Sequence, residues 1–321
     1  MKEEWIAKLV LTVGVMWTRF GGWCSWSLCL LFMAVSVSSS NIPGTPTDGW
    51  GTGDRRAAGE HRRPHSAKDN RLILQTLLPE AIFEGYDEET DLQEISERNA
   101  VWADVMVLGP GIGTTDLSKD MVEEILNAVS DKWGDKAEEK HPLLIIDADG
   151  LNIISSMPHL NDKLKSVAEE IPVVITPHPM EMSRLADCEI SEVVNNPEYY
   201  AETVSGEFGL ITVMKGSQTL ICDAQHEAMF KNTKESPALS KGGSGDVLSG
   251  TIAGLYALMR PSVSLEIALN PMEIAYRAAV AAVLIHAEAG REAALTFGVN
   301  GVLARDTADK LGTVLDRIRM E

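Results

Sequence analysis

The sequence predicts an α/β protein in which helices flank a mostly parallel central sheet. Short apolar runs typical of buried strands recur along the chain, and most are followed by a polar turn and then by a segment of helical periodicity. In such sheets ligands bind beyond the carboxyl ends of the strands. The polar turns of this chain fall at those ends. We therefore expect a single site assembled from several turns.

The first 66 residues, here called the leader, differ from the rest of the chain. They hold five of the seven tryptophans, an apolar stretch over residues 23–37, and a region rich in Gly, Ser, Pro and Arg over residues 38–64. Three interpretations compete: an export or anchoring segment, a disordered extension, or sequence foreign to the natural protein through a wrong start or a reading-frame error. Arg19 and the shortness of the apolar stretch argue against a full membrane span. We favour the third interpretation, because the rest of the chain reads as a cytoplasmic type of protein, which does not need a tryptophan-rich leader. Residues 67–321 are then expected to form the folded domain.

The charge balance argues against nucleic acid as a partner. The formal net charge is −19, and residues 67–321 carry 21 Lys and Arg against 42 Asp and Glu. So acidic a body repels a polyphosphate backbone, although a local cradle can still bind a small phosphate. The four cysteines, Cys24, Cys29, Cys188 and Cys222, follow no metal-ligand spacing. A reducing cytoplasm fits this usage best.

The first predicted elements lead to a glycine turn. Helices are expected over residues 71–78 and 92–99, and a buried strand over residues 101–108. The strand ends in Gly109-Pro-Gly-Ile-Gly-Thr-Thr115, a turn that requires glycine for its tightness. Asp116 is expected to cap a helix that runs to residue 130 with one apolar face.

Three further strands are predicted over residues 143–146, 171–175 and 210–214. The polar turns that follow them cover residues 147–152, 176–181 and 215–219. A short helix is expected over residues 182–185, and a hairpin pairs residues 219–222 with 227–230. Two helices, over residues 271–289 and 302–319, complete the chain. The first of them is rich in alanine and contains His286 and Glu288, to which we assign no chemistry.

A glycine loop over residues 240–250 opens a helix that continues to residue 259. Gly242, Gly243 and Gly245 can adopt positive φ and leave space beside the backbone, so that successive N–H groups can point at one anion. A carboxylate at Asp246, in the first turn, would lie beside that anion, which suggests a role in moving a proton. The alternative is an ordinary glycine turn with Asp and Ser as helix caps.

The other turns also allow two interpretations each. Asp147 and Asp149 can bind Mg²⁺, or they can cap a turn, which we favour for this motif taken alone. His178, held between two prolines, can donate to an anionic oxygen. Glu181 can bind metal-bound water or close a capping box begun at His178 or Thr176.

Lys215 with Gly216 at a strand end can present a cation to a nucleotide phosphate, with a hydroxyl from Thr219, or can form a tight hairpin turn. The chain contains no GxxxxGK[ST] phosphate loop, and the turn from Gly109 lacks the third glycine of GxGxxG. A dinucleotide-binding Rossmann site is therefore not supported.

With these motifs in this order, residues 68–321 resemble the ADP-dependent NAD(P)H-hydrate dehydratases of the ribokinase-like superfamily. The resemblance implies a ribokinase-like fold and a repair reaction, in which hydrated NADH or NADPH is restored with conversion of ADP to AMP and phosphate. It implies that Asp246 takes the proton of the ring hydroxyl as that hydroxyl attacks the β-phosphoryl group, and that phosphate then leaves.

The resemblance also implies a role for each turn. Substrate contacts are expected from Gly111, Gly113, His178 and Asp246. Nucleotide contacts are expected from Lys215, Gly216, Ser217, Gln218, Thr219, Gly242, Gly243, Ser244 and Gly245. Mg²⁺ is expected to bridge the phosphates, with Glu181 behind its water shell. The partners would be the NADH or NADPH hydrate and ADP.

The chain departs from the family at its beginning. Members begin with a strand, a Gly-Ser-type turn and a Gly-Ala helix that lines the substrate site, and residues 50–66 do not match that segment. The sheet is therefore expected to lack its first strand, and the chain to fold less stably than a complete relative and to be impaired in activity.

Two other functions remain open from the sequence. One is a ribokinase-like kinase for a small molecule, and the other is an inactive nucleotide-binding paralogue. The sequence is compatible with a homo-oligomer, and it does not fix the number of subunits, the choice of NADH or NADPH hydrate, or the use of ATP in place of ADP.

Overall fold

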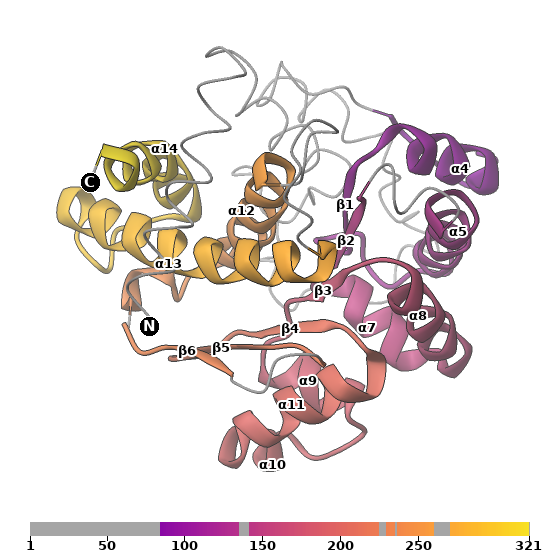
Figure 1. The fold of residues 1–321 in the computed structure, drawn as a ribbon, viewed down its shortest axis with the longest axis horizontal. Helices are drawn as coiled ribbons and strands as arrows, with labels where there is room; N and C mark the ends of the chain where they lie inside the picture. Colours follow the sequence, from indigo (N-terminus) through magenta and orange to yellow (C-terminus); the bar gives the residue numbers. More distant parts are fainter. Residues whose placement is uncertain (1–83, 135–140, 225–228, 235, 260–269, 321) are drawn as a thin grey trace, which may run out of the picture.

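The computed structural model describes residues 84–134, 141–224, 229–234, 236–259 and 270–320. The leader and the helix predicted over residues 71–78 lie outside these ranges. The prediction of a missing first strand concerns the same undescribed part of the chain. Within them the fold is the predicted α/β architecture, with one sheet between two layers of helices (Figure 1).

The sheet has six strands in the order β1-β2-β3-β4-β5-β6. The first four are parallel neighbours: β1 Val105–Leu108, β2 Leu143–Ile146, β3 Val173–Ile175 and β4 Ile211–Met214. The last two strands are β5 Thr219–Cys222, which pairs antiparallel with β4, and β6 Phe230–Asn232, which pairs antiparallel with β5. Because β1 to β4 run in one direction, the turns that follow them meet at one edge of the sheet.

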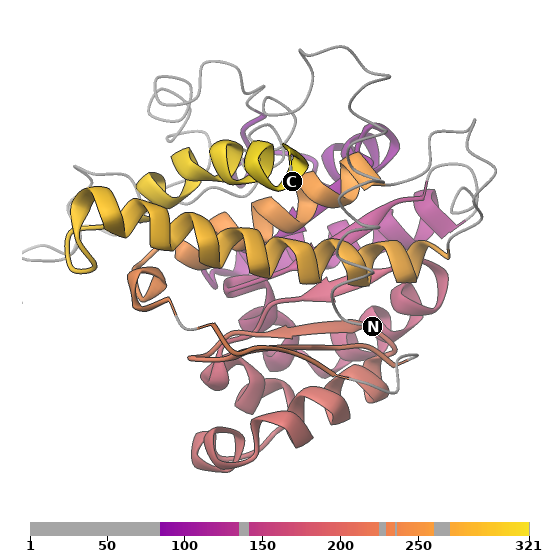
Figure 2. The ribbon, with the colours of Figure 1, turned by 60° about the vertical axis from the view of Figure 1, so that its left-hand side comes forward.

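Helices cover both faces of the sheet, as Figures 1 and 2 show. One face is covered by α4 Leu92–Trp102, α5 Asp116–Trp133, α7 Asp149–Ser156, α8 Pro158–Glu170, α9 Pro179–Leu185, α10 Ile190–Asn195 and α11 Pro197–Phe208. The other face is covered by α12 Ser244–Met259, α13 Pro271–Phe297 and α14 Ala304–Met320. A short 3₁₀ helix, η4 Pro237–Leu239, leads into α12.

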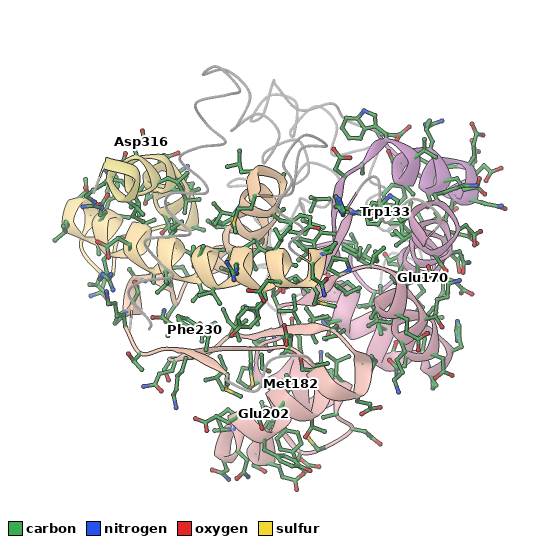
Figure 3. The ribbon with its side chains drawn as sticks, in the orientation of Figure 1. Trp133, Glu170, Met182, Glu202, Phe230 and Asp316 are labelled. Carbon is green, nitrogen blue, oxygen red and sulfur yellow. The ribbon has the colours of Figure 1, made fainter. Side chains whose placement is uncertain are left out.

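Successive side chains of a strand point to opposite faces of the sheet, so that two separate hydrophobic cores form. In β1, Met106 and Leu108 pack into the core under α4 and α5, while Val105 and Val107 pack into the core under α12 and α13. All four residues are buried, which explains why the strand reads as a continuous apolar run. Trp133 (Figure 3) is fully buried at the end of α5, where its indole N–H donates to the carbonyl of Ala100.

Several predicted boundaries differ from those observed. Residues 101 and 102 belong to α4 and not to β1, and the side chain of Thr115, not Asp116, caps α5 by accepting from Ser118 N. α13 continues past residue 289 to Phe297, and β6 begins at Phe230 where the hairpin strand was predicted to end. The helices α7, α8, α10 and α11 were not predicted, and α7 takes up residues 149–152 of the predicted polar turn. Within the described part of the chain, no helix combines the length and the apolar character that a membrane crossing requires.

Candidate functional site

The turns after β1 and β2 pack against each other through their backbones. Gly109 has φ of +118°, and a Cβ placed on it would lie 2.0 Å from the carbonyl oxygen of Asp147 and 2.5 Å from the amide nitrogen of Gly150. Further along the turn, the N–H of Gly113 donates to Oδ2 of Asp149 at 2.9 Å. Gly111 also has positive φ, at 64°. These two predicted substrate glycines therefore lie on a turn fixed by Asp149.

Asp147 is a buried carboxylate with partners from two other elements. Its side chain is 1% exposed, and Oδ1 lies 2.6 Å from Nζ of Lys215 at the end of β4. Oδ2 accepts from the hydroxyl of Ser249 on α12 at 2.8 Å, and Ala148 N donates to Oδ1 at 2.8 Å. The favoured turn-capping interpretation is wrong for Asp147, because Ala148 is the N-cap residue of α7 and no side chain caps that helix. The carboxylate of Asp147 instead contacts a cation and a hydroxyl from other elements.

The turn after β3 contains the predicted capping box. Nδ1 of His178 accepts from the N–H groups of Met180 and Glu181, each at 3.2 Å, and Oε2 of Glu181 accepts from His178 N at 2.8 Å. The box begins at His178 and not at Thr176. Since Nδ1 acts as an acceptor, the neutral ring carries its proton on Nε2. That nitrogen lies 3.2 Å from Oε1 of Glu181, and the side chain is half-exposed.

Burial shifts both members of the box towards their neutral forms. Desolvation, followed by the nearby Lys215 ammonium, lowers the pKa of His178. Desolvation also raises the pKa of Glu181, which is 4% exposed, and the Lys215 ammonium at 3.9 Å from Oε2 opposes that rise. His178 is therefore a neutral donor at neutral pH, suited to a hydroxyl or an amide as well as to an anion.

Lys215 lies at the centre of the carboxyl edge of the sheet. The backbone N–H of Lys215 donates to the carbonyl of Pro177 at 2.8 Å, and the side-chain ammonium lies between the carboxylates of Asp147 and Glu181. Gly216, Ser217 and Gln218 form the short turn that joins β4 to the antiparallel β5, which begins at Thr219. The hairpin interpretation of this motif is confirmed. The structure also places a cation at the strand end, and its contact with a nucleotide phosphate stays a prediction.

The glycine loop brings α12 to that cation. Gly243 has φ of +83°, and α12 begins at Ser244, so that Gly245 and Asp246 lie in its first turn. A Cβ on Gly245 would lie 3.2 Å from Nζ of Lys215 and 3.7 Å from Oδ2 of Asp147. Glycine at this position therefore permits the close approach of the Lys215 ammonium to the helix N-terminus, where the amides carry partial positive charge.

Sequence reasoning missed two polar contacts of α12. Ser249, to which the sequence alone assigned no role, is fully buried and donates its hydroxyl to Asp147. His286 of α13 is 5% exposed, its Nε2 lies 3.4 Å from Oγ of Ser244, and burial lowers its pKa to about 4. The available signal was a serine four residues after Gly245, on the same helix face, in an otherwise apolar segment.

The carboxylates of the site do not form a ready-made metal cage. Among the described residues, no group of three or more His, Cys, Asp and Glu side chains is arranged to hold a metal ion. Asp147 and Glu181 instead flank Lys215. This donor set fits Mg²⁺ only when phosphate oxygens and waters supply the remaining ligands, which is the usual coordination of that ion beside nucleotides.

Comparison with known proteins identifies one enzyme family. A family model described as NAD(P)H-hydrate dehydratase matches residues 65–312. The bifunctional NAD(P)H-hydrate repair enzyme Nnr of Escherichia coli K12 is 29% identical over 248 residues, which is 77% of this chain and 40% of that protein. The ADP-dependent (S)-NAD(P)H-hydrate dehydratase of Lactococcus lactis is 31% identical over 191 residues, 60% of each chain. The chain thus spans about two fifths of the length of the bifunctional relatives.

Solved structures agree on the fold. A ribokinase-like superfamily protein from Enterococcus faecalis V583 superposes with a TM-score of 0.56 at 25% identity, over 78% of this chain and 74% of that one. The ADP/ATP-dependent NAD(P)H-hydrate dehydratase from Bacillus subtilis, co-crystallised with ATP and Mg²⁺, gives 0.55 at 22% identity, over 77% and 76%. The ribokinase-like fold predicted from the motifs is confirmed.

Proposed function

Because the chain belongs to the NAD(P)H-hydrate dehydratase family, we propose that it converts the hydrates of NADH and NADPH back to the reduced coenzymes, with conversion of ADP to AMP and phosphate. One observation supports this proposal above the others. Contacts link all five polar turns: Gly113 with Asp149, Asp147 with Lys215 and Ser249, and Lys215 with Glu181. Such convergence is what a reaction between two large substrates requires.

The reaction proceeds in two steps. The hydroxyl oxygen on the nicotinamide ring attacks the β-phosphorus of ADP and passes its proton to Asp246, while the anhydride bond breaks and AMP leaves. The new phosphate ester then loses phosphate with the electrons of its carbon–oxygen bond, and the ring double bond forms as a ring proton is lost. The sum is removal of one water from the hydrate and hydrolysis of one phosphoanhydride.

The turns divide the two substrates between them. The amides of Gly242, Gly243, Ser244 and Gly245 hold the transferring phosphoryl group at the N-terminus of α12. Lys215 and the turn to Thr219 hold the adenine nucleotide. Gly111, Gly113 and the neutral His178 contact the hydrate.

The proposed reaction also calls for Mg²⁺, which would supply positive charge to offset the negative charge of the phosphates. Glu181 is suited to accept a hydrogen bond from its water shell.

We also place the protein in a reducing, cytoplasmic compartment, because Cys188 and Cys222 are unpaired thiols.

The test follows the absorbance of the restored dihydronicotinamide when the protein is mixed with ADP, Mg²⁺ and chemically hydrated NADH. Asp246→Asn is expected to abolish turnover while ADP binding, measured by calorimetry, persists. Glu198→Gln, which removes an acid from the first turn of α11, serves as the matched control and is expected to keep full turnover. Phosphorylation of a sugar or vitamin precursor without coenzyme recovery would instead identify a kinase. Tight ADP binding without turnover, unchanged by Asp246→Asn, would identify a non-catalytic nucleotide-binding protein.

A further inference from the structure

A buried network joins three strand ends to the helix of the glycine loop. Asp147 follows β2, Thr176 follows β3 and Lys215 follows β4, and all three lie next to α12. The hydroxyl of Ser249 on α12 is 2.8 Å from Oδ2 of Asp147 and 3.4 Å from Oγ1 of Thr176. None of Asp147, Thr176 and Ser249 is more than 1% exposed. These three side chains are therefore shielded from solvent.

The carboxylate of Asp147 accepts three hydrogen bonds in this network. Oδ1 of Asp147 accepts from Lys215 Nζ and Ala148 N, and Oδ2 accepts from Ser249. With these donors in place, Asp147 is a poor candidate for a magnesium ligand or a proton acceptor. A buried carboxylate is costly unless a cation and hydrogen bonds compensate it, and here both are supplied.

The contact with Asp147 restricts the position of the Lys215 ammonium. A lysine side chain has a flexible four-carbon stem, and without such a contact its ammonium would sample many positions. The ammonium of Lys215 lies 2.6 Å from Asp147, beside the space that the missing side chain of Gly245 leaves open, and the side chain as a whole is 22% exposed. The ion pair thus fixes one cation at the first turn of α12, on a side chain that is still partly open to solvent.

We propose that Asp147 is a positioning residue, which holds the Lys215 ammonium against the first turn of α12 so that both bind the same nucleotide phosphate. Ser249 holds the second oxygen of Asp147 and so sets the direction of the carboxylate. The inference rests on the proposed nucleotide site, and it concerns ADP binding rather than the chemistry performed on the hydrate.

The experiment measures ADP and adenosine affinity by calorimetry in the full chain, together with thermal unfolding. Asp147→Asn keeps the shape of the side chain and can still accept from Ser249, but it cannot pair with an ammonium. We expect ADP affinity to fall by about tenfold or more and adenosine affinity to stay within about twofold, because a charge-assisted contact to phosphate is lost. The matched control is Glu198→Gln, which removes the charge from an exposed ion pair with Lys231, also at 2.6 Å, and is expected to leave ADP affinity unchanged.

A double variant tests whether Asp147 acts through Lys215. Lys215→Met should lower ADP affinity and also lower Tm, because it leaves a buried carboxylate without its cation. Adding Asp147→Asn to Lys215→Met should cause no further loss of ADP affinity and should recover part of the lost Tm. Readout by ADP binding keeps the test separate from turnover, so that a chain that binds ADP but does not restore NADH contradicts the proposed function alone.

Any of the following results would overturn the inference. The first is unchanged ADP affinity in Asp147→Asn. The second is an equal loss of ADP and adenosine affinity, which would indicate a general structural role. The third is losses that add in the double variant, or a wild-type chain that binds no ADP.

Discussion

Nε2 of His286 lies 3.4 Å from the hydroxyl oxygen of Ser244, which connects the middle of α13 to the first residue of α12. Both side chains are buried, at 5% and 6% exposure. Because burial lowers the pKa of His286 to about 4, the ring is neutral in the folded protein at neutral pH. The start of the glycine-loop helix is thus supported by a neutral imidazole.

This burial predicts a loss of stability in acid. Between pH 6.5 and 4 the unfolded chain binds a proton at His286 that the folded chain does not, so that the free energy of unfolding falls as pH falls through this window. His286 alone is expected to lower the free energy of unfolding by about 3 kcal/mol across this window. Urea unfolding of the wild type and His286→Gln at several pH values checks it, since the other titrating groups cancel in the difference.

The control for this experiment is His159→Gln, which replaces an exposed histidine on α8. Its free energy of unfolding should parallel that of the wild type across the same pH range. A constant difference between the wild type and His286→Gln from pH 7 to pH 4 would contradict the prediction.

Gly109→Ala is expected to be strongly destabilising. Its Cβ would meet backbone atoms of Asp147 and Gly150, at 2.0 and 2.5 Å, and these cannot move aside as a flexible side chain can. Overpacking and positive φ together give a loss of about 3 kcal/mol or more in the free energy of unfolding. Gly113→Ala is the matched control, because its Cβ would meet only Ser118 Oγ at 3.9 Å and should cost about 1–2 kcal/mol. Similar losses in urea unfolding of the two variants would argue against close backbone packing of the first two turns.

Ala148→Gly is expected to be neutral or stabilising. Ala148 has φ of 49° and ψ of −120°, a conformation that strains any residue with a Cβ. Relief of about 1–3 kcal/mol of strain offsets the entropy cost of glycine, which is about 0.5–1 kcal/mol. Ala308→Gly within α14 relieves no strain and should cost about 1 kcal/mol. Thermal unfolding compares the two, and equal losses would show that Ala148 is not strained.

Magnesium is expected to stabilise the protein only together with ADP. Asp147 and Glu181 are both paired with Lys215, so that a bare divalent cation would be repelled by the ammonium. Phosphate oxygens change that balance. Thermal unfolding should therefore give the same Tm with Mg²⁺ or with EDTA, and a higher Tm with ADP and Mg²⁺ than with ADP and EDTA. A clear rise of Tm with Mg²⁺ alone would point to a metal site built from protein ligands.

Local patterns were sufficient for the elements that are buried on both sides or capped by their own residues. The strand over residues 143–146 was predicted with its observed ends, because four apolar residues stand between Pro142 and Asp147. The capping box that ends at Glu181 was one of the two interpretations of that turn, with His178 as one of its two possible starts, and the structure confirms it there, since its partners are three residues apart. The boundary at residues 101–102 was wrong, because an apolar run does not reveal by itself where a helix ends and a strand begins.

The sequence by itself determined the α/β class, the glycine loop before α12, and the position of each polar turn after a strand, since all of these depend on neighbouring residues. Only the tertiary structure decided which side chains meet. Asp147 could be a metal ligand or a cap in the sequence, and it became the partner of Lys215 and Ser249, which are 68 and 102 residues away. Such pairings depend on the order and register of the strands, which place distant turns at one edge, and no local pattern carries that information.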